Sequence, residues 1–523
     1  MKHLVVNDSD GHISGVQVTP SGATTAPPTV VSNISYRPFG PIGSYTLGNG
    51  QTIVRTYDAN YRLTDLTSPA LNLHFARDAM GDIVALGNAA GANPATETYS
   101  YDPLYRLTGI TDAGTALESY TYNQTGDRLS KTAPGLATGA YLYTTGTHQL
   151  SSIGNAPQAN DADGNTTGSV IAGNTYGFGY NGRNRMTVVQ LNGQTVGNYT
   201  YNAMGMRIGK VGTVPQATIE RYAYDEGGHL LGEYGTTSRD YVWLGEIPVA
   251  VMDNTVSGNV TASTVNFVTA DQLGTPRAVS NSTGTVIWQL TYQGNPFGEQ
   301  KPTSTTGYVL NLRLPGQYYD AESGLSNWGF RSYEAATGRS PQSDPMGVYG
   351  GQWSTYAYVG SDPLRNVDPY GLASQLTVGV GGAFIGLVTG DSASVNVGFN
   401  LDWWNSSVYV QDQVNLGGPG TASGAFGGWG GMLSYTPNSA APASGFSSAP
   451  YFEADAGWGP SGGVSGTKDP CGHIDWSLIR GLKGGPGVGA GAFTGTSYTA
   501  TGVSPSARTM ISILKSQFTD SGI

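Results

Sequence analysis

The sequence has a single cysteine, Cys471, in 523 residues, so no disulfide can form within the chain and cysteine usage indicates no redox compartment. It also has no uninterrupted apolar run of about 18 residues, which excludes a membrane-spanning helix. The N-terminal residues, MKHLVVNDSDGHISG, contain no apolar core of signal-peptide length. We therefore expect secretion or cell-surface delivery without a cleavable N-terminal signal, either for this chain or for a longer one of which it is a part.

Charged residues are also scarce, at 12% of the chain, which is about half the usual share. The formal net charge is −11. Proteins that bind nucleic acid need Lys and Arg to contact the phosphates, so we expect no nucleic-acid partner for the whole chain.

Glycine and tyrosine are what the sequence has in excess. Its 78 glycines are about twice the usual share, and its 32 tyrosines far outnumber its 13 phenylalanines. Disordered chains are rich in charge and poor in aromatic residues, so this composition argues against disorder. It is typical of many short strands joined by turns that contain Gly, Asn and Asp, and it predicts an all-β chain.

A repeat begins at Tyr36, in which Tyr is followed by Asp or Asn and then by Arg with an apolar residue. The clearest copies are TYDANYRL at 56–63, SYDPLYRL at 100–107 and TYNQTGDRL at 121–129, and degenerate copies begin at 179, 200 and 223. Adjacent visible copies are about 21–23 residues apart.

Each copy has the pattern of a β-hairpin. Tyr ends one strand, the Asp or Asn side chain can bond backbone amides of the turn, a nearby Gly or Asn takes a positive φ, and Arg-Leu starts the returning strand. A single hairpin cannot bury its face alone, so the copies must stack. Spacing alone leaves open a β-propeller, whose blades would have about twice this period.

The segment 314–372 contains the densest set of motifs. Short stretches with Tyr and Trp are broken by Gly, Asp-Pro and Ser, and DPMGV at 344–348 is nearly repeated as DPYGL at 368–372. After Leu372 the composition changes abruptly, and no Lys or Arg occurs between Arg365 and Lys468. This change indicates a domain boundary and a candidate processing site.

This segment resembles the RHS repeat-associated core domain, which closes the YD-repeat shell of bacterial RHS proteins and of the C component of insecticidal toxin complexes. The matching stretches are GQYYD at 316–320, GL at 324–325, TGR at 337–339, DPMG at 344–347, YAY at 356–358 and DPYGL at 368–372. The upstream copies resemble the YD repeat by motif and period. The resemblance implies hairpins wound as a spiral into a hollow shell over 36–313, closed by a core at 314–372.

The resemblance also implies a reaction. In this family the core is an intramolecular aspartic protease that cuts after the final Leu and releases a C-terminal effector enclosed in the shell. The cut would fall here between Leu372 and Ala373, with Asp344 and Asp368 as the catalytic pair and Arg339 as a candidate for steering it. Two close carboxylates share a proton, so one can act as a base on water and the other as an acid on the scissile carbonyl.

A simpler interpretation of both aspartates is that they begin ordinary Asp-Pro turns, since Asp followed by Pro is a common turn signal. The simpler interpretation of Arg339 is that it stabilises the fold and takes no part in the reaction. No cofactor or metal is implied.

Residues 373–523 form a separate Gly-rich region. Alternation of apolar with small or polar residues predicts about six to eight strands, with examples at 377–387, 393–401, 408–414, 427–435, 451–458 and 488–503. Apolar residues at helical spacing predict a short C-terminal helix at 507–518, and a second short helix is expected at 476–482.

The candidate effector site in this tail comprises Cys471, His473 and Asp475. A Cys and a His can act as nucleophile and base, although residues two apart are poorly placed to orient onto each other. A metal site would need three or four ligands, so none is predicted. Two further interpretations stay open: a soluble β-domain with one buried face, and a membrane-active sheet whose aromatic side chains contact lipid.

We therefore predict the C-terminal part of an RHS polymorphic toxin. Its parts are an irregular N-terminal segment at 1–35, a YD-repeat shell at 36–313, an autoproteolytic core at 314–372 and an effector domain at 373–523. The expected partner is the chain's own C-terminal domain as enclosed cargo. An upstream shell segment, a component of the secretion machinery or an immunity protein are further candidates. The alternatives are a non-cleaving surface or adhesion protein, or a tail enzyme that uses Cys471 and His473.

Overall fold

The structure is a computed structural model of the chain. It describes residues 2–9, 11–19, 29–38, 41–133, 137–236, 238–257, 260–347, 352–372, 374–385, 390–400, 407–416, 422–437, 445–468 and 474–503, the last six ranges by their backbone alone. The chain divides into two compact units, Met1–Val348 with Gln352–Gly371, and Tyr349–Gly351 with Leu372–Ile523.

The first unit is built on a 28-stranded antiparallel sheet in which each strand pairs with the next along the chain. Its first half comprises β1 Lys2–Asn7, β2 Ile13–Thr19, β3 Thr29–Tyr36, β4 Ile42–Leu47, β5 Thr52–Tyr57, β6 Leu63–Ser68, β7 Leu71–Arg77, β8 Ile83–Gly87, β9 Ala95–Tyr101, β10 Leu107–Asp112, β11 Thr115–Tyr122, β12 Arg128–Thr132, β13 Gly139–Tyr143 and β14 Leu150–Ile153. Its second half comprises β15 Ala156–Asn160, β16 Thr166–Ile171, β17 Asn174–Tyr180, β18 Met186–Leu191, β19 Gln194–Tyr201, β20 Arg207–Gly212, β21 Thr218–Tyr224, β22 Leu230–Gly235, β23 Ser238–Leu244, β24 Ile247–Ser257, β25 Val260–Ala270, β26 Pro276–Ser280, β27 Val286–Gln289 and β28 Thr303–Ser304. This uninterrupted meander rules out the propeller interpretation.

The repeat motif folds locally as its residues predict. Tyr57 ends β5, and the next residue, Asp58, accepts the N–H groups of Asn60 and Arg62 through one carboxylate oxygen at 2.9 Å each. The other oxygen accepts Nε of Arg62 at 2.7 Å. The positive φ falls on Tyr61 here and on Gly126 in the copy at 121–129. The Asp thus closes the turn and orients the Arg at the start of the returning strand.

The repeat tyrosines also join successive hairpins. The hydroxyl of Tyr57 donates to the carbonyl of Ile42 at 2.9 Å, and that of Tyr122 donates to Leu107 at 2.8 Å. Tyr101, Tyr143, Tyr180 and Tyr201 make equivalent bonds to earlier strands or their borders. Each Tyr therefore ties its own hairpin to the preceding one, which explains why the motif recurs with the hairpin period.

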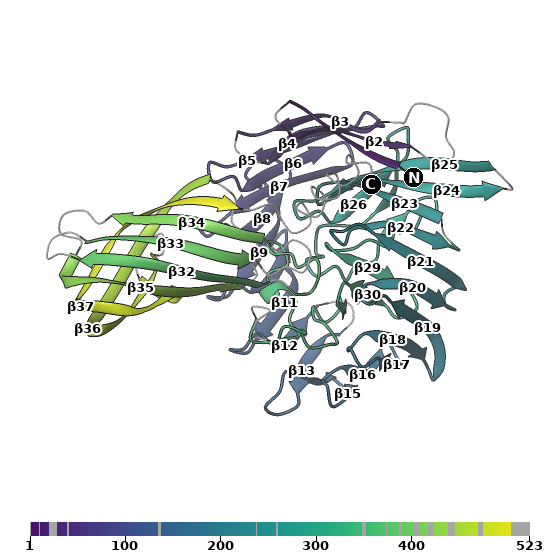
Figure 1. The fold of residues 1–523 in the computed structure, drawn as a ribbon. Coiled ribbons are helices and arrows are strands. Elements are labelled where there is room, and N and C mark those ends of the chain that lie inside the picture. Colours follow the sequence, from purple (N-terminus) through teal and green to yellow (C-terminus); the bar gives the residue numbers. More distant parts are fainter. Residues whose placement is uncertain are drawn as a thin grey trace, which may run out of the picture. The chain divides into compact units, whose positions relative to one another are not determined.

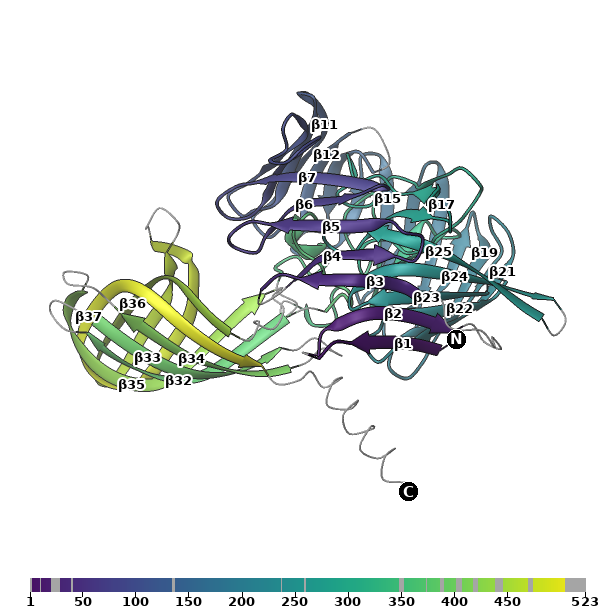
Figure 2. The same ribbon diagram turned by 90° about the horizontal axis from the view of Figure 1, so that it is seen from above.

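The sheet curves back on itself as a spiral. Figure 1 shows the strands following one another around a curved wall, and Figure 2 shows β2 and β3 beside β23 to β25. Buried residues of β2–β6 and of β23–β25 belong to one hydrophobic cluster. The turn before β5 also contacts the turn before β27, because Gln51 Nε2 donates to the carbonyl of Gly284 at 3.0 Å.

The core segment lies within this curve (Figure 1) and has its own three-stranded sheet, β29 Gln317–Asp320, β30 Leu325–Trp328 and β31 Arg331–Tyr333, followed by the 3-10 helix η2 Val359–Ser361. Ion pairs fix it to the wall. Asp320 pairs with Arg207, and with Lys210 at 3.2 Å. Arg365 pairs with Asp82 at 2.8 Å.

The second unit contains one six-stranded antiparallel sheet in the order β34-β33-β32-β35-β37-β36. The strands are β32 Ser374–Ile385, β33 Gly390–Asn400, β34 Ser407–Leu416, β35 Ala422–Pro437, β36 Gly445–Lys468 and β37 Ile474–Val503. All six stretches expected to be strands are strands over the residues that the structure describes. The strand β37 also pairs with β34 through residues 496–503.

The structure corrects two expectations. The described residues of the segment 1–35 are not irregular, because they include β1, β2 and most of β3, which begin the sheet. Residues 476–482 are not helical but belong to β37, where Ile479, Gly481 and Leu482 pair with β36 across a shift in register. The helix expected at 507–518 lies outside the described residues. Among the described residues, no helix has the length and apolar character needed to cross a membrane.

Candidate active site

The first predicted carboxylate, Asp344, begins a turn in the core. Its N–H donates to the carbonyl of Thr355 at 2.8 Å, and its own carbonyl accepts the N–H of Gly347 at 2.8 Å. Its Oδ1 accepts the N–H of Met346 at 2.8 Å. These bonds form an Asx turn that uses one carboxylate oxygen and leaves Oδ2 for another partner.

The second predicted carboxylate, Asp368, sits in the matching turn. Its Oδ1 accepts the N–H of Gly371 at 2.8 Å, and its carbonyl accepts Nε1 of Trp328. Gly371 has φ +73°, a backbone conformation that glycine adopts without strain. The turn interpretation and the catalytic interpretation of the two Asp-Pro elements are therefore compatible, because the turns occupy only the Oδ1 atoms.

Arg331, the first residue of β31, joins the two carboxylates. Its Nη2 lies 3.0 Å from Oδ2 of Asp344 and 3.5 Å from Oδ2 of Asp368. Its Nη1 donates to the carbonyl of Thr355 at 3.1 Å, and its Cζ lies 4.5 Å from the centre of the Trp328 ring. Both carboxylates thus face one guanidinium group, and all three side chains are almost fully buried.

Burial determines the protonation of this pair. It raises the pKa of Asp344 to about 6, and the negative charge of Asp368 adds to the rise. The charge of Arg331 and the N–H of Met346 oppose it. Burial and the charge of Asp368 also raise the pKa of the Tyr358 hydroxyl. The pair can therefore hold one proton close to neutral pH, which is the state that acid–base catalysis by two carboxylates requires.

Arg339, the arginine that the sequence suggested for this role, has other partners. Its Nη2 donates to the carbonyl of His148 at 2.6 Å. Its guanidinium lies over the rings of Tyr143 and Tyr356, with Cζ at 5.1 and 4.9 Å from their centres. It links the core to the wall, and none of these contacts involves a carboxylate of the pair.

Sequence reasoning missed Arg331 because its signal is weak. It is the one arginine between Trp328 and Tyr333, in short strands that carry no obvious motif, whereas Arg339 belongs to a distinct Thr-Gly-Arg stretch. Only the folded core brings β31 against two turns that are distant in sequence.

The other predicted site residues lie at or beyond the end of the core. Leu372 directly follows Gly371 in the chain, and Ala373 lies outside the described residues. Cys471 and His473 also lie outside them, and Asp475 is described only as part of the backbone of β37. In the described part of the chain, no group of three or more His, Cys, Asp or Glu side chains is placed to hold a metal ion.

Comparison with known proteins supports the assignment of family. No family model matches the chain. It is 29% identical to the probable deoxyribonuclease RhsA of Dickeya dadantii (strain 3937) over 388 residues, which cover 67% of this chain and 26% of that protein. It is also 29% identical to the double-stranded DNA deaminase toxin A of Burkholderia cenocepacia (strain H111) over 234 residues, which cover 40% of this chain and 16% of that protein.

The fold is similar to a chain in the crystal structure of TcdB2-TccC3-Cdc42, with a TM-score of 0.58 at 20% identity, over 71% of this chain and 20% of that one. The chain spans about a quarter of RhsA and a smaller share of the other two. The chain is therefore similar in sequence to RHS proteins and other toxins, and its repeat sheet with the core folded against it has the fold of that TcdB2-TccC3 chain.

Proposed function

We propose that the core of this toxin is an aspartic autoprotease that cleaves its own chain between Leu372 and Ala373. The observation that supports it is the pair of buried carboxylates, Asp344 and Asp368, which share Nη2 of Arg331 at 3.0 and 3.5 Å. A structural role alone would not need two acids against one arginine in a buried place, where the second negative charge is costly. The chain itself also runs from Asp368 through Gly371 directly to the scissile bond.

The proposed step is hydrolysis in cis. Asp344, whose pKa is raised to about 6, carries the shared proton, and Asp368 takes the role of the base. Asp368 takes a proton from a water molecule as the water oxygen bonds to the carbonyl carbon of Leu372, while Asp344 donates its proton to the carbonyl oxygen. The C–N bond then breaks as the nitrogen of Ala373 takes the proton held by Asp368, and one hydroxyl of the diol returns a proton to Asp344, which leaves the new carboxyl group on Leu372. Arg331 positions both carboxylates and balances the remaining negative charge.

Cleavage would separate residues 373–523 as a toxic effector, held as cargo by the shell until delivery. The relatives support this part, since their names describe a probable deoxyribonuclease and a double-stranded DNA deaminase toxin. The chemistry of this effector stays unassigned. Its stretch without Lys or Arg from 366 to 467 gives no support for contacts to nucleic-acid phosphates.

The test is the intact mass of the purified protein under denaturing conditions, for wild type beside Asp344→Asn and Asp368→Asn. We expect two fragments that divide after Leu372 in the wild type and one undivided chain in each variant. Circular dichroism of the variants controls for folding. A single intact wild-type chain would contradict the autoprotease and would favour a non-cleaving structural or surface protein.

A further inference from the structure

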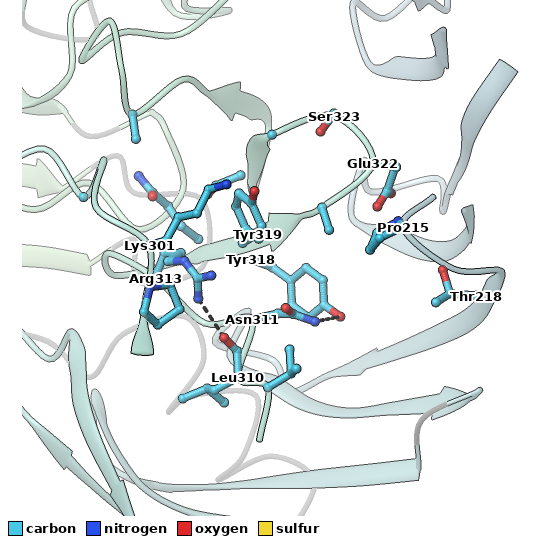
Figure 3. A pocket seen from close by; sticks show the side chains of 18 of the residues that line it. Pro215, Thr218, Lys301, Leu310, Asn311, Arg313, Tyr318, Tyr319, Glu322 and Ser323 are labelled. Atoms are coloured by element: carbon cyan, nitrogen blue, oxygen red, sulfur yellow. Dashed lines mark hydrogen bonds between the residues drawn. The ribbon is translucent and has the colours of Figure 1, made fainter. Parts of the chain in front are cut away.

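A cavity of about 1260 Å³ lies between the wall and the core hairpin of the first unit. Its lining includes residues in and around β20 and β21 and in the segments 298–313 and 317–326. Figure 3 shows Arg313, Lys301 and Tyr319 close together on one side, with Glu322 and Ser323 across from them. The proposed protease step makes no use of these residues.

Arg313 is a buried cation of this cavity without an acidic partner. Its side chain lines the cavity, although the residue is only 8% exposed. Its Nη1 donates to the carbonyls of Leu310 and Leu312 at 2.7 and 2.9 Å. Among the described residues, no carboxylate lies within ion-pair distance of it, and Nε and Nη2 make no hydrogen bond. One edge of the guanidinium is therefore left with unused donors.

The desolvation of Arg313 is not balanced by neighbouring charge. Burial lowers its pKa to about 10, and the nearby hydroxyls of Tyr319, Tyr318 and Tyr241 offset only part of that effect. The ring of Tyr319 lies under the guanidinium, with Cζ at 4.7 Å from the ring centre. A cation held in this way gains most from an anion that arrives from the cavity.

Gln317 provides a second unused donor in the same wall of the cavity. It is 3% exposed, and its Nε2 has no hydrogen-bond partner among the described residues. It is held beside Arg313 by the backbone, because the N–H of Arg313 donates to the carbonyl of Gln317 at 3.0 Å. A buried amide N–H without a partner is costly and calls for an acceptor.

Two of the acidic residues that line the cavity have cationic partners. Glu322 accepts the hydroxyl of Tyr199 at 3.0 Å and pairs with Lys210 at 3.4 Å. Asp253 pairs with Arg239 at 2.6 Å. Arg313 is thus a buried cation of this lining with no carboxylate within ion-pair distance among the described residues.

We propose that Arg313 and Gln317 form a binding site for a carboxylate in this cavity, with Lys301 at its rim. One guanidinium edge and one amide N–H supply the donors that a single carboxylate accepts. A phosphate dianion would need a second buried cation, and Lys301 is exposed. The ligand is a small organic acid or the acidic side chain of a peptide, since both present the same group.

The experiment measures binding to the full-length protein by isothermal titration calorimetry with four probes. They are succinate, an Ala-Glu-Ala tripeptide with both ends blocked, its Ala-Gln-Ala counterpart, and inorganic phosphate. We expect the Glu peptide or succinate to bind and the Gln peptide not to bind. Tighter binding of succinate would identify a small acid, and tighter binding of the Glu peptide an acidic peptide. Preference for phosphate, or no binding by either carboxylate, would overturn the proposal.

Two variants locate the site. Arg313→Gln should weaken carboxylate binding by about tenfold or more, the effect of losing a charged hydrogen-bond partner. Gln317→Met should weaken it too, yet its melting temperature should stay equal or rise, because the change removes a buried donor without a partner. Arg221→Gln, on the exposed side of β21, is the matched control and should bind as wild type does. Unchanged affinity in both site variants would overturn the assignment.

Discussion

Single residues of the core can be separated by the partners they contact, and the two buried arginines give the clearest contrast. Arg331 faces Asp344 and Asp368, so Arg331→Gln would leave two buried carboxylates without a cation. We expect it to lower the free energy of unfolding by about 3–5 kcal/mol and to abolish self-cleavage. Arg339→Gln should leave self-cleavage in place, because its contacts are the His148 carbonyl and two tyrosine rings. Denaturant unfolding and intact mass measure the two effects.

The variants Arg331→Gln and Arg339→Gln can be compared directly because both arginines are buried and both lie over aromatic rings. If Arg339→Gln folds and stays uncleaved while Arg331→Gln is cleaved, the roles assigned to the two arginines are reversed. Loss of cleavage in both variants with equal loss of stability would indicate a general folding defect and would count against a specific role for Arg331.

The raised pKa of Asp344 predicts a dependence of stability on pH. Its pKa is about 6 in the folded protein against 3.8 ordinarily. A carboxyl group with a raised folded pKa contributes stability below its unfolded pKa, and that contribution is lost as the pH rises through the folded pKa. As the pH rises from 4 to 7, the free energy of unfolding of the single variant Asp368→Asn should therefore fall by up to about 3 kcal/mol relative to that of the double variant Asp344→Asn/Asp368→Asn.

Both of these chains lack the catalytic pair, so they are compared without any difference in cleavage. Burial is the largest cause of the shift and persists when Asp368 is neutral. Urea unfolding at pH 4, 5, 6 and 7 gives the free energies. If the free energies of unfolding of the two chains depended on pH in the same way, Asp344 would have an ordinary pKa.

At the level of elements, the turn between Arg313 and Gln317 packs against the second catalytic turn. Gly316 has φ +78°, and a Cβ built there would lie 1.9 Å from the carbonyl oxygen of Pro369. Gly316→Ala should therefore displace the Asp368–Gly371 turn and stop self-cleavage. Gly324→Ala is the control, because Gly324 has φ +73° with no atom within 4 Å of its Cβ. It should cost about 1 kcal/mol in backbone strain and leave cleavage intact. Intact mass and thermal unfolding measure both variants.

Elements were predictable from the sequence where their signals are local. The strand ends at Tyr57 and Tyr122 follow from the Tyr-Asp and Tyr-Asn pairs, because the carboxylate or amide side chain closes the turn by itself. The strands β1 and β2 lack that motif and were missed, since only pairing with the next strand defines them. The helix expected at 476–482 was wrong because long-range pairing with β36 overrides local propensity.

The candidate site was predictable in part for the same reason. Asp344 and Asp368 stand in two nearly identical turn motifs, so a search of the sequence finds both. Arg331 comes from a short strand with no motif, and its contact with both turns depends on the tertiary fold of the core. Arg313 and Gln317 are likewise brought to one cavity by the fold and not by their spacing.

For the whole molecule, all pairings of β1 to β31 lie within the first unit. The hydrophobic clusters of the described residues likewise draw on positions from 13 to 359 and Leu364. The chain 1–372 should therefore fold when produced alone. Its melting temperature should lie within about 2 °C of the first transition of the full-length Asp368→Asn chain, which stays uncleaved. Thermal unfolding followed by circular dichroism compares the two, with Asp368→Asn also placed in the shorter chain so that only the tail differs. An aggregated fragment, or one that melts much earlier, would mean that the shell depends on residues 373–523 for its folding, and the view of that tail as separable cargo would have to be abandoned.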